Sequence, residues 1–161
     1  MALRLNIPHF RTADVVAIAN VPQETVEQWV KQGHLSLDAR PHGRETGLYT
    51  GSDVLKVCAA AELSRLGVAP SRSTAGLADS IASRCRVWYQ QEHLHVWGDP
   101  ELLSGRDGGR FLVVNTDDTG RHDWSFVSGP GLETVGATQG LVVDCFKIAE
   151  RVFPELIARL A

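Results

Sequence analysis

The chain has 161 residues, a length that suits one domain or a small domain with an appendage. Its residues are 43% hydrophobic and 22% charged, which is typical of a globular protein with its own core. No apolar run approaches the roughly 18 residues of a membrane span, and residues 1–14 lack the features of a signal peptide. We therefore expect a cytoplasmic protein without a membrane partner.

The net charge of −3 argues against a protein that binds nucleic acid by charge alone. The charge is nevertheless unevenly distributed. Residues 1–72 contain eight Lys or Arg and seven Asp or Glu, whereas residues 73–161 contain eight and twelve. Three of the six histidines also lie in the first part. This polarity is weakly typical of a DNA-reading head joined to a separate body.

Two short helices are predicted near the N-terminus. The first opens with Thr12 as its N-cap and ends before the break at Asn20. The second has Pro22 in its first turn and ends at Gln32, before Gly33. Two helices joined by a turn of three to four residues form a helix-turn-helix.

Two further helices follow the loop that begins at Gly33. Ser52 is predicted to cap the third helix, and Gly67 is predicted to end it. A fourth helix is expected from about Ser71 to Glu92, with roughly 30 Å of length from its rise per residue. Its inward-facing residues are expected to be Leu77 or Ala78, then Ile81, Cys85 and Trp88.

The pattern changes to strands after residue 92. Residues 93–98 are a possible strand, and residues 110–128 are predicted to form a β-hairpin around the turn at 117–120. A glycine-rich loop is expected at 129–140. A terminal helix should then open at Thr138 or Gln139, and Pro154 should break or restart it.

The three cysteines are odd in number, widely spaced and surrounded by apolar residues. This pattern favours buried thiols over a zinc site, with metal or redox sensing as the alternative. The cysteines are Cys58, Cys85 and Cys145.

Enzyme motifs are weak or incomplete. Residues 131–138 come close to a phosphate-binding loop, but Ala137 replaces the lysine that the loop needs. A carboxylate cluster could hold a divalent ion, although acids in a hairpin turn usually form the turn itself. His93 and His95 could be metal ligands, but they lack a paired motif. We therefore expect no enzyme, metal or cofactor. The carboxylate cluster comprises Asp117, Asp118, His122 and Asp123.

The segment from Phe10 to about Val68 resembles the MerR family of DNA-binding regulators and the MerR-like excisionases. The matching motifs are VPQETVxxW, GHL and LYTxxDV, in that order. The resemblance implies a winged helix whose wing is the loop between GHL and LYT. It also implies binding to double-stranded DNA. The candidate DNA-contacting residues are Arg11, Thr12, Gln23, Thr25, Gln28, Lys31, Arg40, His42, Arg44 and Tyr49.

Different chemistry is expected of different candidates. Thr12 and the 22–25 turn lie at helix N-termini, which bind phosphate. Thr25 and Gln28 project from the second helix, where polar side chains can reach base edges. Basic residues of the wing can reach phosphates or the minor groove, and the resemblance implies that Tyr49 packs the wing. The wing residues are Arg40, His42 and Arg44.

Two positions depart from the family pattern. The wing reads Thr46-Gly47-Leu48-Tyr49, so the usual arginine is absent, and Arg44 or Arg40 is expected to replace it. Glu27 stands where the family favours a basic residue, and an acid facing DNA would repel phosphate. Trp29 shares its helical face with Val26 and Val30 and is expected in the core.

The sequence thus predicts an α+β protein in three parts. These are a winged helix-turn-helix head at 1–69, a connecting helix at 70–92, and a small hairpin-plus-helix region at 93–161. The predicted function is a sequence-specific transcriptional regulator. The alternatives are an excisionase-type architectural protein and an adaptor that binds protein through the head.

A homodimer is also expected. Apolar side chains recur along residues 141–161, and the hairpin offers limited area to cover them, so a second copy should bury the excess. The residues in question are Val142, Cys145, Phe146, Ala149, Val152, Phe153, Leu156, Ile157 and Leu160. The C-terminal region could also receive an unknown small-molecule or protein effector.

Overall fold

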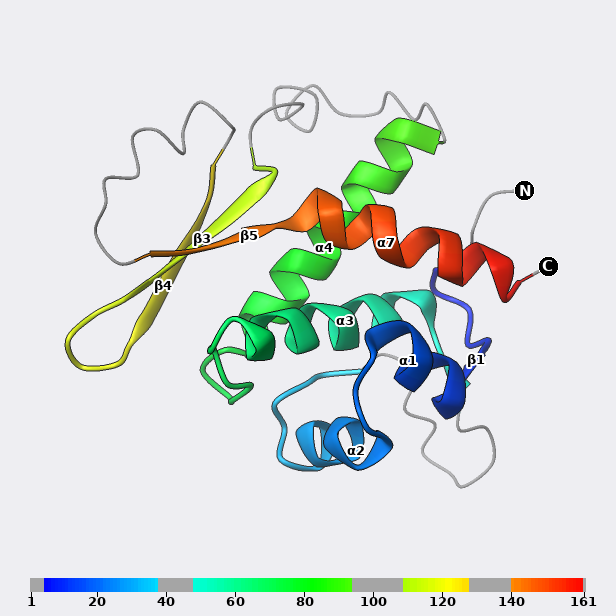
Figure 1. Ribbon diagram of the computed structural model, residues 1–161, viewed down its shortest axis with the longest axis horizontal. Coiled ribbons are helices and arrows are strands. Elements are labelled where there is room, and N and C mark those ends of the chain that lie inside the picture. The colour runs from blue at the N-terminus through cyan, green and yellow to red at the C-terminus, as the bar shows by residue number, and fades with distance from the viewer. Residues whose placement is uncertain (1–4, 38–47, 94–108, 128–139, 161) are drawn as a thin grey trace.

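The computed structural model describes residues 5–37, 48–93, 109–127 and 140–160, without the side chains of 91–93. These residues form five helices and two small antiparallel sheets, which confirms the α+β class (Figure 1). No helix in the described ranges combines the length and apolar character needed to cross a membrane. The helices are α1 (Thr12–Ala19), α2 (Gln23–Lys31), α3 (Gly51–Arg65), α4 (Ala75–His93) and α7 (Cys145–Ala158).

The first sheet pairs β1 (Phe10–Arg11) with β2 (Leu48–Tyr49), in a register that places Phe10 opposite Tyr49. The chain passes directly from β1 into α1. Arg11 rather than Thr12 is the N-cap of α1, and the Arg11 amide donates a 2.8 Å hydrogen bond to Asp14 Oδ2. The prediction of a Thr12 cap was therefore wrong: Thr12 is the first residue of the helix, and the Asp14 carboxylate in the first turn accepts the amide of the residue before it.

The turn between α1 and α2 forms where the sequence predicts it. Asn20 takes the left-handed conformation with φ 53°, and Gly33 does so after α2 with φ 73°. A residue in the left-handed conformation ends a helix, and glycine and asparagine are the residues that most often adopt it there. Val26 and Trp29 of α2 are buried, which confirms the expected core face.

Helix α3 lies at the centre of the molecule and is buried on nearly all sides. Its N-cap is Thr50, not the predicted Ser52. The Asp53 amide donates to Thr50 Oγ1 at 3.0 Å, and the Thr50 amide donates to Asp53 Oδ2 at 2.9 Å. This reciprocal capping box satisfies two amides at once, whereas Ser52 lies buried inside the first turn.

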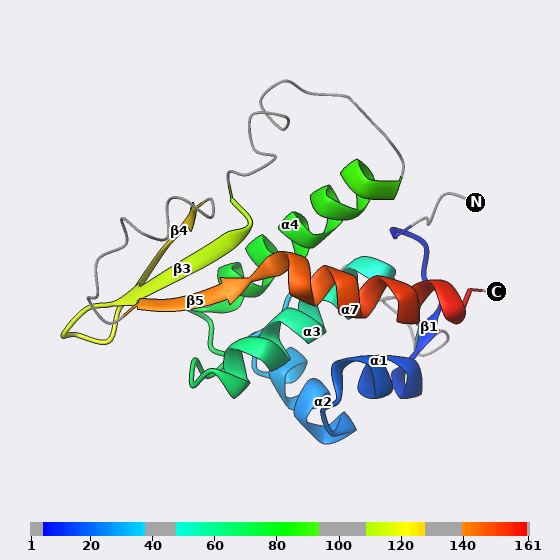
Figure 2. The same cartoon turned by 45° about the horizontal axis from the view of Figure 1, so that its top comes forward.

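Helices α4 and α7 pack against α3 and against each other, as two views show (Figures 1 and 2). Ring stacking contributes to this contact, since Tyr89 lies parallel to Phe153 with centroids 4.1 Å apart. Helix α4 begins at Ala75 rather than at Ser71, because residues 71–74 form a turn. Its apolar residues Leu77, Ala78, Ile81 and Cys85 are buried as predicted. The expected connecting helix is therefore a core element.

The second sheet has the order β4-β3-β5 and consists of β3 (Phe111–Thr116), β4 (His122–Val127) and β5 (Gly140–Asp144). The predicted hairpin is confirmed. Asp117 builds its turn by accepting hydrogen bonds from the amides of Thr119 and Arg121, each at 2.9 Å, and Gly120 follows with φ 79°.

Three predictions about the C-terminal part were wrong. Residues 140–144 form a strand, so the terminal helix begins at Cys145, with Asp144 as its N-cap. Helix α7 continues through Pro154. Proline has no amide to donate to the Glu150 carbonyl. Glu150 and Pro154 are both exposed, so this carbonyl is not buried without a partner. His93 ends α4 rather than opening a strand, and the rest of 93–98 lies outside the described residues, like 128–139.

The apolar face of α7 is buried within the chain. Its buried residues pack in one core with residues of α1, α3 and α4, so the reason given for a dimer through residues 141–161 was wrong. The exposed large apolar residues of this segment are Val142 at 41% and Ile157 at 45%. The face consists of Cys145, Ile148, Ala149, Val152, Phe153 and Leu156.

The three cysteines are buried as free thiols, as expected. Burial raises the pKa of Cys58 and of Cys145 to about 12, and it raises the pKa of Cys85 well above its ordinary value. Thiols that stay protonated are poor nucleophiles and poor metal ligands. Their role in the described structure is to fill the core between α3, α4 and α7.

Candidate nucleic-acid interface

Helix α2 presents a polar face opposite its buried face. Gln28 and Lys31 are exposed, whereas Thr25 is half-buried and thus less accessible than the sequence suggested. Helix α2 lies on the side of α3 away from α7, whereas α1 lies beside both α3 and the C-terminal half of α7 (Figures 1 and 2). Val26 and Trp29 hold α2 in the core, so the orientation of the exposed side chains is fixed by packing.

Two acids share the exposed face of α2. Glu24 and Glu27 outnumber Lys31, the basic residue of the helix. Gln23, a predicted DNA contact, donates from Nε2 to Glu27 Oε1 at 2.6 Å. This bond orients the Glu27 carboxylate along the helix and uses one amide donor of Gln23. The face is therefore suited to hydrogen bonding more than to unspecific attraction of phosphate.

The N-terminus of α1 is less suited to phosphate than predicted. Arg11 is exposed and Thr12 is half-buried. The carboxylate of Asp14 occupies the N-terminal position by accepting the Arg11 amide. Negative charge at this end satisfies the helix dipole and repels a second anion. Arg11 remains an exposed cation at the start of α1.

The wing candidates can be located only in part. Tyr49 is half-buried in β2, and its carbonyl oxygen accepts the His9 amide at 2.9 Å. The β1–β2 pairing therefore fixes the point at which the chain returns from the predicted wing. Arg40, His42 and Arg44 lie outside the described residues.

Two arginines that the sequence did not single out bind the C-terminal end of α1. Arg65 of α3 donates from Nη2 to Ala19 O at 2.7 Å, and Arg151 of α7 donates from Nη1 to Ile18 O at 3.4 Å. Cations at this end complement the helix dipole. They fix the turn that sets the angle of α2. These contacts join residues 46 and 133 positions apart, so no local sequence signal predicts them.

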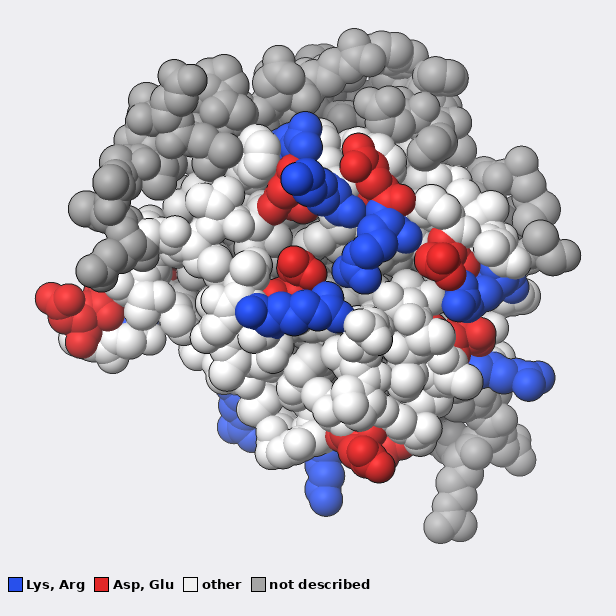
Figure 3. Space-filling model, in the orientation of Figure 1, with Lys and Arg blue, Asp and Glu red and all other residues white. Residues whose placement is uncertain are grey.

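Charges of both signs interleave over α3 and α7 on the described part of the face in Figure 3. Steering of DNA by a broad positive field is therefore not a property of this face. The acids of the β3–β4 turn serve the hairpin. Hydrogen bonds from Thr119 and Arg121 lower the pKa of Asp117, and His122 Nδ1 lies 2.8 Å from Thr116 Oγ1. Residues 131–138, with the phosphate-loop likeness, lie outside the described ranges.

A comparison with protein-family models finds no match for this chain, and a comparison with curated proteins likewise finds none.

Proposed function

We propose that the protein is a sequence-specific DNA-binding regulator and that α2 is its reading helix. One observation carries the proposal. Gln28 and Lys31 are exposed on the second helix of a tight helix-turn-helix, while Val26 and Trp29 lock the opposite face into the core. A rigid helix with polar groups on its outer face is the element that enters a major groove in this class of protein.

The chemistry of the exposed residues supports this assignment. A glutamine can pair with the N6 and N7 atoms of adenine through two hydrogen bonds, and Gln28 has its side chain exposed for this contact. Lys31 lies in the last turn of α2, where a cation is compatible with the helix dipole and available for a phosphate. In the proposal, β1 and β2 form the base of a wing that carries Arg40, His42 and Arg44.

We further propose that two copies bind two half-sites. A two-fold dimer presents two reading helices, and their separation then sets the spacing of the half-sites. The apolar face of α7 is buried, so it is not the interface of this dimer. Light scattering of the intact protein at micromolar concentration tests the dimer, and a monomer that retains tight DNA binding contradicts it.

A protein-binding adaptor is the second candidate. Glu24 and Glu27 favour it, because two acids on an exposed helix face suit a basic protein surface better than a phosphate backbone.

Selection of bound DNA from a random pool separates the candidates. An enriched palindrome supports the regulator, clustered direct repeats support an excisionase, and no enrichment supports the adaptor. Gln28→Ala should relax the preference at one base position at a cost of about 1–3 kcal/mol. Gln90→Ala, which changes an exposed glutamine of α4, is the matched control and should leave the motif unchanged. An identical motif for Gln28→Ala and the wild type removes Gln28 from base reading.

A further inference from the structure

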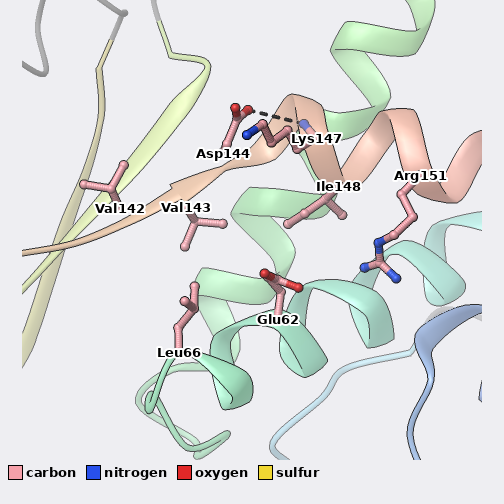
Figure 4. Close-up of a pocket in the computed structure, with 8 residues that line it drawn as sticks. All are labelled: Glu62, Leu66, Val142, Val143, Asp144, Lys147, Ile148 and Arg151. Atoms are coloured by element: carbon pink, nitrogen blue, oxygen red, sulfur yellow. Dashed lines mark hydrogen bonds between the residues drawn. The ribbon is translucent and has the colours of Figure 1, made fainter.

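A pocket of about 290 Å³ lies between the C-terminal end of α3, strand β5 and the first half of α7. In Figure 4, Glu62 and Leu66 extend from α3 toward α7, and Arg151 extends from α7 toward α3. Binding pockets for small molecules span roughly 300–1,000 Å³, so this one suits a small ligand. Its lining residues are Glu62, Leu66, Val142, Val143, Asp144, Lys147, Ile148 and Arg151.

The two acids of the pocket are already paired with arginines that do not line it. Arg110 donates to both oxygens of Asp144, with Nη2 to Oδ2 at 2.7 Å and Nε to Oδ1 at 3.0 Å. Arg65 Nη1 lies 3.1 Å from Glu62 Oε2. Each acid is thus neutralised from outside the pocket.

The two cations of the pocket are differently placed. In the described part of the chain, neither Lys147 nor Arg151 is within ion-pair distance of a carboxylate. The balance of charge in the pocket is therefore positive. An anionic group of a ligand would gain hydrogen bonds to charged donors, which are the stronger kind.

The rest of the pocket wall is apolar. Leu66 and Val142 are each 41% exposed, which is high for large aliphatic side chains, and Val143 and Ile148 lie beneath them as buried residues. A ligand that covers Leu66 and Val142 would remove this apolar surface from water, at a gain of about 25 cal/mol per Å². The pocket therefore combines an anion-binding end with an apolar surface.

Both charged walls of the pocket are connected to the helix-turn-helix. Arg151 is the residue that donates to Ile18 O at 3.4 Å, at the C-terminal end of α1. Glu62 holds Arg65, which donates to Ala19 O at 2.7 Å and to Asn20 O at 3.4 Å. An anion that draws the Arg151 guanidinium toward the pocket would move Nη1 away from the Ile18 carbonyl. Ligand binding and the geometry of the α1–α2 turn then share one residue.

We propose that this pocket binds a small carboxylate with an apolar body, and that the ligand acts on the α1–α2 turn through Arg151. The ligand site stands on the pocket alone, whereas the effect on DNA rests on the proposed function. A ligand shifts a conformational equilibrium only by its difference in affinity for two states. Here the two states are Arg151 bonded to the Ile18 carbonyl and Arg151 released from it toward the pocket.

Binding is tested with benzoate, isovalerate and 4-phenylbutyrate, each compared with its neutral amide by calorimetry or ligand-observed NMR. At least one carboxylate should bind, and its amide should bind at least about tenfold more weakly, since a hydrogen bond to a charged group contributes about 1.5–3 kcal/mol. Lys147→Gln should cause a similar loss. Arg121→Gln, which removes an exposed arginine before β4 and outside the lining, should retain binding. Equal binding of acid and amide, or no binding by any of the three acids, overturns the site.

The coupling is tested without DNA. In ¹⁵N-correlated NMR spectra, the bound carboxylate should shift the backbone amides of Asn20 and Val21 in the wild type. In Arg151→Gln these amides should already be displaced, and the carboxylate should not move them further. Lys147→Gln should leave them at their wild-type positions. A carboxylate that binds without moving these amides overturns the coupling. Because this test contains no DNA, its outcome does not depend on whether the protein binds DNA. A failure of the pocket is therefore distinguishable from a failure of the proposed DNA-binding function.

Discussion

Gln28 and Lys31 lie three positions apart on the exposed face of α2, and each has a different task in the proposed complex. Gln28 can report base identity through hydrogen bonds, whereas Lys31 can neutralise a phosphate. Glu27 lies beside both, and its bond to Gln23 keeps its carboxylate on the helix surface. The contributions of Gln28 and Lys31 to DNA affinity can be separated, because a phosphate contact makes the affinity depend on salt concentration.

Lys31→Gln should weaken binding to all DNA sequences and reduce the slope of log K against log salt by about one, because one phosphate contact releases about one counterion. A fluorescence titration at several salt concentrations measures the slope. Lys147→Gln removes the same charge from α7, on the other side of α3, and should leave the slope unchanged. An unchanged slope in Lys31→Gln places Lys31 outside the interface.

Helix α7 illustrates how a single residue supports an element. Asp144 accepts the amides of Phe146 at 3.1 Å and Lys147 at 3.3 Å, and it also pairs with Arg110. The pKa of Asp144 is lowered from its ordinary value. Burial acts to raise it, but the hydrogen bonds from Arg110, Lys147 and Phe146 outweigh burial. A carboxyl whose folded-state pKa is lowered stabilises the fold at pH values above its unfolded pKa.

Asp144→Ala should lower the free energy of unfolding by about 1–2 kcal/mol at neutral pH, through the loss of the cap and of the Arg110 pair. The difference from wild type should begin to shrink as the pH falls below about 4, the ordinary pKa of an unfolded aspartate. It should disappear once the pH falls below the lower pKa of Asp144 in the folded state. Urea unfolding at several pH values measures both. Asp118→Ala in the β3–β4 turn is the control, and an exposed site there should change stability by less than about 0.5 kcal/mol. A difference that stays constant with pH contradicts the ionic origin.

The molecule as a whole has one core that includes residues of the predicted head and of the C-terminal region. Helix α3 packs against α1, α4 and α7, and α7 also contacts α1 through Arg151 (Figures 1 and 2). Removing α7 would therefore expose the inner faces of α3 and α4 to water. Removal of α7 is therefore expected to destabilise the whole fold, and not only the C-terminal region.

A chain that ends at residue 139, without β5 and α7, should fail to fold cooperatively rather than yield a free head. It loses the buried contacts of Ile148, Val152, Phe153 and Leu156, each of which typically contributes a few kcal/mol. Thermal unfolding followed by circular dichroism measures this loss. Ile157→Ser, at an exposed position of α7, is the control and should still unfold cooperatively. A cooperative transition in the truncated chain would show that the head is stable alone.

Local features of the fold could be predicted from the sequence because their causes lie within a few residues. Asn20 and Gly33 end helices by adopting positive φ, and the turn residues 117–120 between two strand-forming runs set the β3–β4 hairpin. The capping box of α3 was also local, since Asp53 follows Thr50 by three residues. The pattern of Thr50 and Asp53 was present in the sequence, but the predicted cap was Ser52. The core face of α2 followed from helical spacing alone.

Only the tertiary structure decided the features that depend on distant residues. Strand β5 exists because β3 offers it a partner, and helix α7 continues through Pro154 because the carbonyl left free lies at the exposed Glu150. The pocket and the two arginines at the end of α1 bring together segments separated by up to 133 positions. Sequence patterns encode which face of an element is apolar. They do not encode which element covers that face. The packing of α7 against α1 and α3 placed Arg151 between the pocket and the α1–α2 turn.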